Sequence, residues 1–197
     1  MSSNSHTVRI MVLMALYSAL AVVLDIVKEF IPFTSIWANG GSVDISLIPL
    51  VFASIHLGWK IGVITGLLQF VVSFVIGLTK LYFAAYSPIL GFMCDYIIPI
   101  AIMGMASILI QDDKPAGDNI IRLEIGIIIC GFIRMFSQVI SGVYCWVDAA
   151  DIGTSAAWIF SLQYNLSYGI PTMIVLLVIM PILYRAFMPV IKKRYSI

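Results

Sequence analysis

The sequence predicts an all-α integral membrane protein, a six-transmembrane-helix bundle that forms one membrane domain over residues 1–197. Of the 197 residues, 61% are hydrophobic and only 11% are charged, and the mean hydropathy is +1.06. A typical soluble domain has about 25% charged residues, so this composition excludes an ordinary soluble protein. The net charge of +1 gives no indication of a nucleic-acid partner.

The spans follow from apolar runs close to the length of about 20 residues that crosses a bilayer as a helix. The predicted spans cover residues 8–27, 47–57, 61–78, 89–110, 123–144 and 164–187. The second run is too short to cross an ordinary bilayer alone, so we expect it to be tilted or to begin inside a protein-lined cavity. We expect no cleavable signal, because residues 1–7 are polar and no small-residue cleavage site precedes Asp25.

The distribution of lysine and arginine predicts that both termini are cytoplasmic. With six spans that start inside, eight of the eleven basic residues fall on the cytoplasmic side: Arg9, Lys60, Lys114, Arg122, Arg185, Lys192, Lys193 and Arg194. Lys28 and Lys80 fall outside, and Arg134 lies within the fifth span. The polar segment 111–122 is then an inner loop between two three-helix halves.

Several motifs of enzymes and ATPases are missing from the chain. It has no GxxxxGK[ST] loop, no HExxH and no GxSxG. We therefore expect a protein that is not an enzyme and does not hydrolyse ATP itself. His6 and His56 are the only histidines, and the cysteines form no CxxC pair, so we expect no metal and no cofactor.

Polar and aromatic residues gather toward the outer ends of the predicted spans. They are Trp37, Asn39, Asp44, Ser46, Asp95, Tyr96, Gln138, Tyr144, Trp146, Trp158, Phe160, Tyr164 and Asn165. An aromatic belt at the lipid interface explains the tryptophans and tyrosines, but not Asp95, Gln138 and Asn165. An acid at a helix centre costs about 2.5–3.5 kcal/mol, unless it faces a cavity and is satisfied by ligand, water or Arg134. The mixture favours a small pocket for a flat polar ligand.

Small residues recur at four-residue spacing on two predicted helices. Ala15 and Ala19 share one face of the first span, and Gly58, Gly62 and Gly66 share one face of the third. Such patterns let membrane helices approach closely. The glycines are expected to pack inside the bundle, whereas the alanines fit either internal packing or a partner helix.

The chain resembles the substrate-binding S component of an energy-coupling factor (ECF) vitamin transporter, most closely its thiamine-specific branch. The resemblance covers nearly the whole chain and is carried by "GGSVDISLIPLVFASIHLGWKIGVITGLLQ" (40–69), "CDYIIPIAIMGMA" (94–106), "FSQVISGVYCW" (136–146) and "FSLQYNLSYGIP" (160–171). It implies a multi-pass protein of the bacterial plasma membrane that binds a vitamin near the outer face, under a lid made by the first loop. It also implies assembly with a transmembrane coupling protein and two ATPase subunits, with Ala15 and Ala19 in the docking face.

The resemblance also implies ligand-binding residues. Asp95 and Tyr96 match an acid–tyrosine pair that contacts the ligand, Trp146 matches an aromatic residue that stacks on a ring, and Asn165 matches an asparagine that hydrogen-bonds the ligand. Trp37 is the candidate for a tryptophan of the lid.

Two positions depart from the family pattern and leave the ligand open. Gln138 stands in place of a histidine, and Phe160 stands in place of a tyrosine; Tyr164 belongs to the same expected pocket. Thiamine, a cation that could gain about 0.5–2 kcal/mol over a tryptophan ring, is the first candidate. Gln138 offers both a donor and an acceptor, which suits pyridoxine-type (vitamin B6) ligands or the pyrimidine precursor of thiamine. The alternative of another class is a non-transport intramembrane enzyme or a structural subunit.

Overall fold

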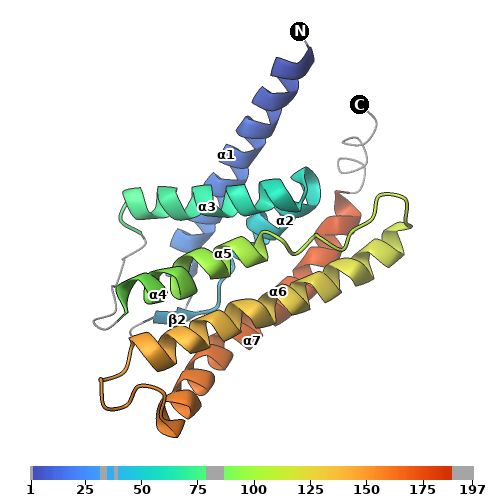
Figure 1. Cartoon of the computed structure of the whole chain (residues 1–197). Coiled ribbons are helices and arrows are strands. Elements are labelled where there is room, and N and C mark those ends of the chain that lie inside the picture. Colours follow the sequence, from blue (N-terminus) through green and yellow to red (C-terminus); the bar gives the residue numbers. More distant parts are fainter. Residues whose placement is uncertain (1, 32–34, 38–39, 79–86, 188–197) are drawn as a thin grey trace.

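The computed structural model describes residues 2–31, 35–37, 40–78 and 87–187. It is a bundle of helices with one short hairpin (Figure 1). The elements are α1 (Ser2–Lys28), β1 (Ser35–Trp37), β2 (Gly40–Ser42), α2 (Leu47–Leu57), α3 (Trp59–Val75), α4 (Pro88–Phe92), the π-helix η1 (Met93–Ile97), α5 (Ile98–Met103), α6 (Ala116–Cys145) and α7 (Ser155–Ala186).

Each predicted span falls on a helix, and α4, η1 and α5 follow one another without a break to form the fourth. The fourth span is shorter than predicted, because residues 104–109 form turns and not helix. By length and composition, α1, α6 and α7 can each cross a membrane, whereas α2, α3 and α4–α5 are shorter apolar helices. The antiparallel hairpin of β1 and β2 between the first two helices was not predicted.

The short helix α2 is the centre of the core. Ten of its eleven residues are buried, and Leu50, Val51 and Ala53 have exposed fractions of 1% or less. A helix that is apolar on nearly every side packs in a protein core or in lipid, and the burial of α2 shows that protein surrounds it. Its first turn reaches the cavity described below through Leu47 and Leu50. This explains how an 11-residue apolar run occupies the middle of the bundle without crossing it alone.

Glycines allow α3 to pack against its neighbours, as predicted. A Cβ atom on Gly62 would lie 2.5 Å from the Ser54 Cβ and 2.5 Å from the Gly104 carbonyl oxygen, and one on Gly66 would lie 2.7 Å from Ile100 Cγ2. Gly58 has a different role, because its φ of +94° forms the tight junction between α2 and α3.

The two ends of the bundle differ. The start of α1 and the end of α7 lie at the same end of the molecule, while β2 and the connection between α6 and α7 lie toward the other (Figure 1).

Candidate functional site

A cavity of about 320 Å³ lies at the end of the bundle that carries the hairpin. Every helix contributes to its wall except α4, and the segment before α2 covers one side. The lining consists of Asp25, Lys28, Gly41, Ser42, Asp44, Ser46, Leu47, Leu50, Gln69, Phe70, Asp95, Tyr96, Pro99, Ile100, Arg134, Gln138 and Tyr168. Charged, amide and aromatic side chains are therefore concentrated on one space inside an apolar bundle.

The π-helical turn η1 places Asp95 and Tyr96 in this wall. Pro99 follows within α5 and explains the irregular turn: it has no N–H for the Asp95 carbonyl four residues earlier, and its ring would clash with that carbonyl. Widened turns of this kind occur frequently at functional sites. The aromatic rings of Phe70 and Tyr96 lie 5.9 Å apart and form an aromatic corner of the wall.

Asp95 is held by neutral donors. The Ser141 hydroxyl and the Trp146 indole N–H each donate a hydrogen bond of 2.7 Å to Asp95 Oδ2. Arg134, which the sequence offered as a possible partner for Asp95, pairs with a different acid. Asp95 is therefore fixed in position without a salt bridge among the described residues.

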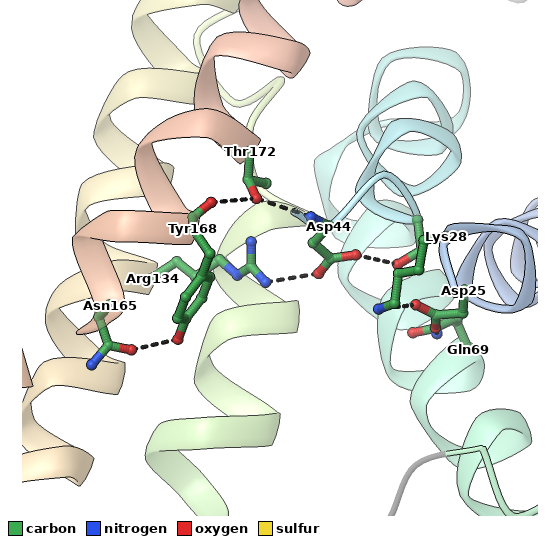
Figure 2. Close-up of polar contacts among 9 residues, drawn as sticks. Asp25, Lys28, Asp44, Gln69, Arg134, Asn165, Tyr168 and Thr172 are labelled. Atoms are coloured by element: carbon green, nitrogen blue, oxygen red, sulfur yellow. Dashed lines mark hydrogen bonds and ion pairs between the residues drawn. The ribbon is translucent and has the colours of Figure 1, made fainter. Parts of the chain in front are cut away.

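Asp44 joins the segment before α2 to two long helices (Figure 2). Its Oδ2 accepts from Arg134 Nη2 of α6 at 2.7 Å, and its backbone N–H donates to Thr172 Oγ1 of α7 at 2.9 Å. Its Oδ1 accepts from the Ser46 hydroxyl at 2.6 Å. Burial alone would raise the pKa of Asp44, but the positive charges of Lys28 and Arg134 outweigh that effect and hold the pKa below its ordinary value.

A second ion pair lies on the α1 side of the cavity. Lys28 Nζ is 2.8 Å from Asp25 Oδ1, and both side chains are less than one-fifth exposed. Asp25 Oδ2 also accepts from the Gln69 amide of α3 at 2.8 Å. Figure 2 shows these residues on the side of Asp44 opposite Arg134.

Tyr168 and Asn165 form a buried polar pair on α7. The Tyr168 hydroxyl donates to Asn165 Oδ1, and Tyr168 lines the cavity. Asn165 is only 3% exposed and also donates to the Ser161 carbonyl at 2.9 Å. Asn165 thus supports a residue of the wall and is not itself part of the lining.

Two buried polar atoms on α6 have no hydrogen-bond partner among the residues that the structure describes. They are the Arg134 Nε donor and the Gln138 Oε1 acceptor. The two residues are one helical turn apart and both line the cavity. An unsatisfied buried polar atom is costly, so these atoms indicate where a bound molecule would form hydrogen bonds.

The structure places some of the residues predicted for the site in the cavity wall and others outside it. Asp95, Tyr96 and Gln138 line the cavity, and Trp146 contacts it indirectly through its bond to Asp95. Phe160 is 59% exposed and stacks on Tyr164, with ring centroids 6.2 Å apart, and neither belongs to the cavity lining. The backbone of Trp37 pairs with Gly40 in the hairpin, while its side chain lies outside the described part of the chain.

Among the residues of the wall that sequence reasoning missed, four have charged, amide or phenol side chains: Asp25, Lys28, Gln69 and Tyr168. The first two lie three residues apart at the end of an otherwise apolar helix, and Gln69 is a lone amide in an apolar run. Polar residues that interrupt an apolar span in this way were the sequence signal that could have indicated these positions of the cavity wall.

The predicted docking residues lie on the surface of α1. Ala15 and Ala19 are both exposed, so they do not pack inside the bundle. The alternative of internal packing is wrong for this pair.

Comparison with known proteins identifies the family. The model of the thiamine transporter protein family (Thia_YuaJ) matches residues 11–192. The thiamine transporter ThiT of Bacillus subtilis (strain 168) is 32% identical over 190 residues, which is 93% of this chain and 94% of that protein. A solved structure of ThiT from Listeria monocytogenes has the same fold, with a TM-score of 0.74 and 22% identity over 94% of this chain and 98% of that one. The chain therefore belongs to the thiamine transporter protein family, as a multi-pass transport protein of the bacterial plasma membrane and not an enzyme.

Proposed function

We propose that the chain is the S component of an ECF-type importer and that it binds thiamine in the cavity of about 320 Å³. Family membership supports the ligand, because the Bacillus subtilis relative is named a thiamine transporter. The volume supports it as well, since it falls at the lower end of the range of about 300–1,000 Å³ found for small-molecule sites.

The charge of the cavity is the observation that carries this proposal. The lining holds three carboxylates and two basic side chains. Asp25 pairs with Lys28 and Asp44 pairs with Arg134, whereas both described partners of Asp95 are neutral. A ligand with one positive charge balances Asp95, and thiamine carries one such charge on its thiazolium ring.

The wall also suits the aminopyrimidine ring of thiamine. Such a ring has amino hydrogens that donate and ring nitrogens that accept. Within the described part of the chain, Gln138 Oε1 is an acceptor without a partner, and Arg134 Nε is a donor without one. The nearby rings of Phe70, Tyr96 and Tyr168 offer flat apolar contacts.

Pyridoxine-type ligands and the pyrimidine precursor are the second candidates. Gln138 favours them, because an amide can donate to or accept from a ring hydroxyl or a ring nitrogen. Neither of them carries a permanent positive charge that could balance the Asp95 carboxylate. Thiamine is therefore ranked first.

Delivery across the membrane is proposed to depend on partner proteins. We propose six spans with both termini cytoplasmic, and an ECF module made of a transmembrane coupling protein and two ATPase subunits. The common location of the start of α1 and the end of α7, opposite the cavity, supports this orientation (Figure 1). The exposed Ala15 and Ala19 support docking through α1, because small residues allow close helix approach.

Ligand identification tests the proposal. The purified protein is denatured, and the released small molecule is identified by mass spectrometry. Calorimetric titration of the ligand-free protein with thiamine, pyridoxine and the pyrimidine precursor then ranks them. Thiamine should be released and should bind most tightly. Tighter binding of pyridoxine would overturn the ligand assignment, and absence of an ATPase-bearing partner after gentle purification from native membranes would overturn the S-component assignment.

A further inference from the structure

A second cavity lies at the other end of α1 and shares no residue with the first. Its volume is about 180 Å³, and it is lined by the start of α1, the end of α2 and the start of α3. Its polar lining is basic, consisting of His6, Arg9 and His56, and no carboxylate belongs to its described lining. The remaining lining is apolar: Ile10, Leu13, Leu57 and Ile61.

His56 is the rigid part of this cavity. Its imidazole is only 6% exposed, and its Nδ1 lies 2.7 Å from the Tyr17 hydroxyl. The ring also packs edge-on against Tyr17, with centroids 6.0 Å apart, and lies 6.4 Å from the Phe52 ring. A hydrogen bond to one ring nitrogen fixes the orientation of an imidazole. The protein therefore holds a buried polar ring in the wall of a cavity whose other polar residues are also basic.

The surface beside the cavity is suited to lipid. Val8, Met11 and Val12 on α1 are 53%, 54% and 61% exposed. In a membrane protein these side chains contact acyl chains or an apolar partner. The cavity thus lies where basic side chains from two helices meet an apolar face that continues along α1.

We infer that this cavity binds the phosphate headgroup of an anionic phospholipid, with an acyl chain lying along the exposed face of α1. The inference uses the proposed orientation, which places this end of α1 on the cytoplasmic side. Arg9 can donate two parallel hydrogen bonds to phosphate oxygens, His6 adds a polar side chain from the same helix, and His56 forms the α2 side of the wall. Basic pockets between transmembrane helices on the cytoplasmic side are suited to such headgroups. A general attraction between surface lysines or arginines and anionic lipid would need neither a cavity nor a buried histidine. The presence of both here therefore favours a specific site.

Lipid retention tests the inference. The full chain is reconstituted in nanodiscs with equal parts of phosphatidylglycerol and phosphatidylcholine, and the lipids that remain bound are identified by native mass spectrometry. The wild type should retain phosphatidylglycerol in preference. The double variant His6→Gln/Arg9→Gln should lower that preference about tenfold, because it removes a charge-assisted contact. Both residues are exposed, so folding should be unaffected, and thermal unfolding in phosphatidylcholine alone checks this.

Arg185→Gln is the matched control. Arg185 is an exposed arginine near the end of α7, at the same end of the bundle, and it does not line the cavity. The preference of the Arg185→Gln variant for phosphatidylglycerol should equal that of the wild type. Thiamine affinity should be unchanged in both this variant and the double variant. An equal loss in both arginine variants would show a diffuse surface effect and overturn the site. If millimolar inorganic phosphate or glycerol 3-phosphate displaces the retained lipid completely, the cavity selects a soluble phosphate, and the lipid assignment is overturned.

Discussion

Asp95 and Asp44 face the same cavity but are stabilised in different ways. Asp44 has a salt bridge to Arg134 and a hydrogen bond from Ser46, whereas Asp95 has only neutral donors. A carboxylate held by neutral donors stays fixed and keeps its charge available to a ligand, because no protein cation has to be displaced first. Asp44 is thus suited to a structural role, and Asp95 is suited to binding.

Asp95→Asn should weaken thiamine binding at least tenfold, because it removes the charge that balances the thiazolium. Hydrogen bonds to a charged group contribute about 1.5–3 kcal/mol, which corresponds to that loss or more. Calorimetric titration measures it. The matched control is Asp148→Asn, an exposed acid in the loop after α6, which should bind thiamine like the wild type. Unchanged affinity in Asp95→Asn would remove this residue from the binding site.

Asp44→Asn should destabilise the folded protein by about 3 kcal/mol, because it leaves the buried Arg134 without its partner. Unfolding in a denaturing detergent titration measures the loss. Replacing both partners, as in Asp44→Asn/Arg134→Met, should recover much of it, because no unpaired charge then remains. A double variant no more stable than Asp44→Asn would show that the salt bridge is not the cause.

At the level of single residues, the sequence predicted some of the polar residues that line the cavity, but not the residues with which they pair. Asp95, Tyr96 and Gln138 were found because their chemistry is unusual inside a span. The pairing of Arg134 with Asp44 joins residues 90 positions apart and depends on how the segment before α2 is folded. No local pattern encodes such a contact.

The composite helix α4–η1–α5 shows how an irregular element serves a site. Its π-helical turn holds Asp95 and Tyr96, and Pro99 lies four residues after Asp95. Helix existence was predictable from apolar runs, because span length is set by the bilayer. The π-turn, the β1–β2 hairpin and the early end of α5 were not, because they depend on backbone contacts that hydropathy does not contain.

Pro99→Ala should restore a regular helical hydrogen bond to the Asp95 carbonyl and move the acid out of register with the cavity. We expect thiamine affinity to fall about tenfold, equivalent to the loss of one hydrogen bond to a charged group, while thermal stability is equal or higher. Calorimetric titration and thermal unfolding on the same sample distinguish a loss of binding from a loss of stability. Pro181→Ala, in α7 and outside the cavity lining, is the control and should keep full affinity. Full affinity in Pro99→Ala would contradict this role for the π-turn.

At the scale of the whole molecule, binding and docking are assigned to different parts of α1. Its C-terminal end supplies Asp25 and Lys28 to the cavity, while Ala15 and Ala19 lie exposed further toward its start. The family resemblance predicted this division, and the exposure of both alanines is what docking requires.

Ala19→Trp should abolish assembly with the ECF module and vitamin uptake, because the bulky ring prevents close approach of a partner helix. Thiamine affinity of the isolated chain should stay unchanged. The control is Leu20→Trp, at an exposed neighbour that points about 100° away around the helix, and it should still assemble. Normal assembly of Ala19→Trp, or equal loss in both variants, would contradict docking through this face.

The central position of α2 has a consequence for the two cavities. Leu47 and Leu50 at one end of this helix line the cavity of about 320 Å³, and His56 and Leu57 at the other end line the second cavity. Eleven residues of helix are about 16 Å long, roughly half of the 30 Å hydrocarbon core of a bilayer. The protein that separates the two cavities along α2 is therefore one short, closely packed helix.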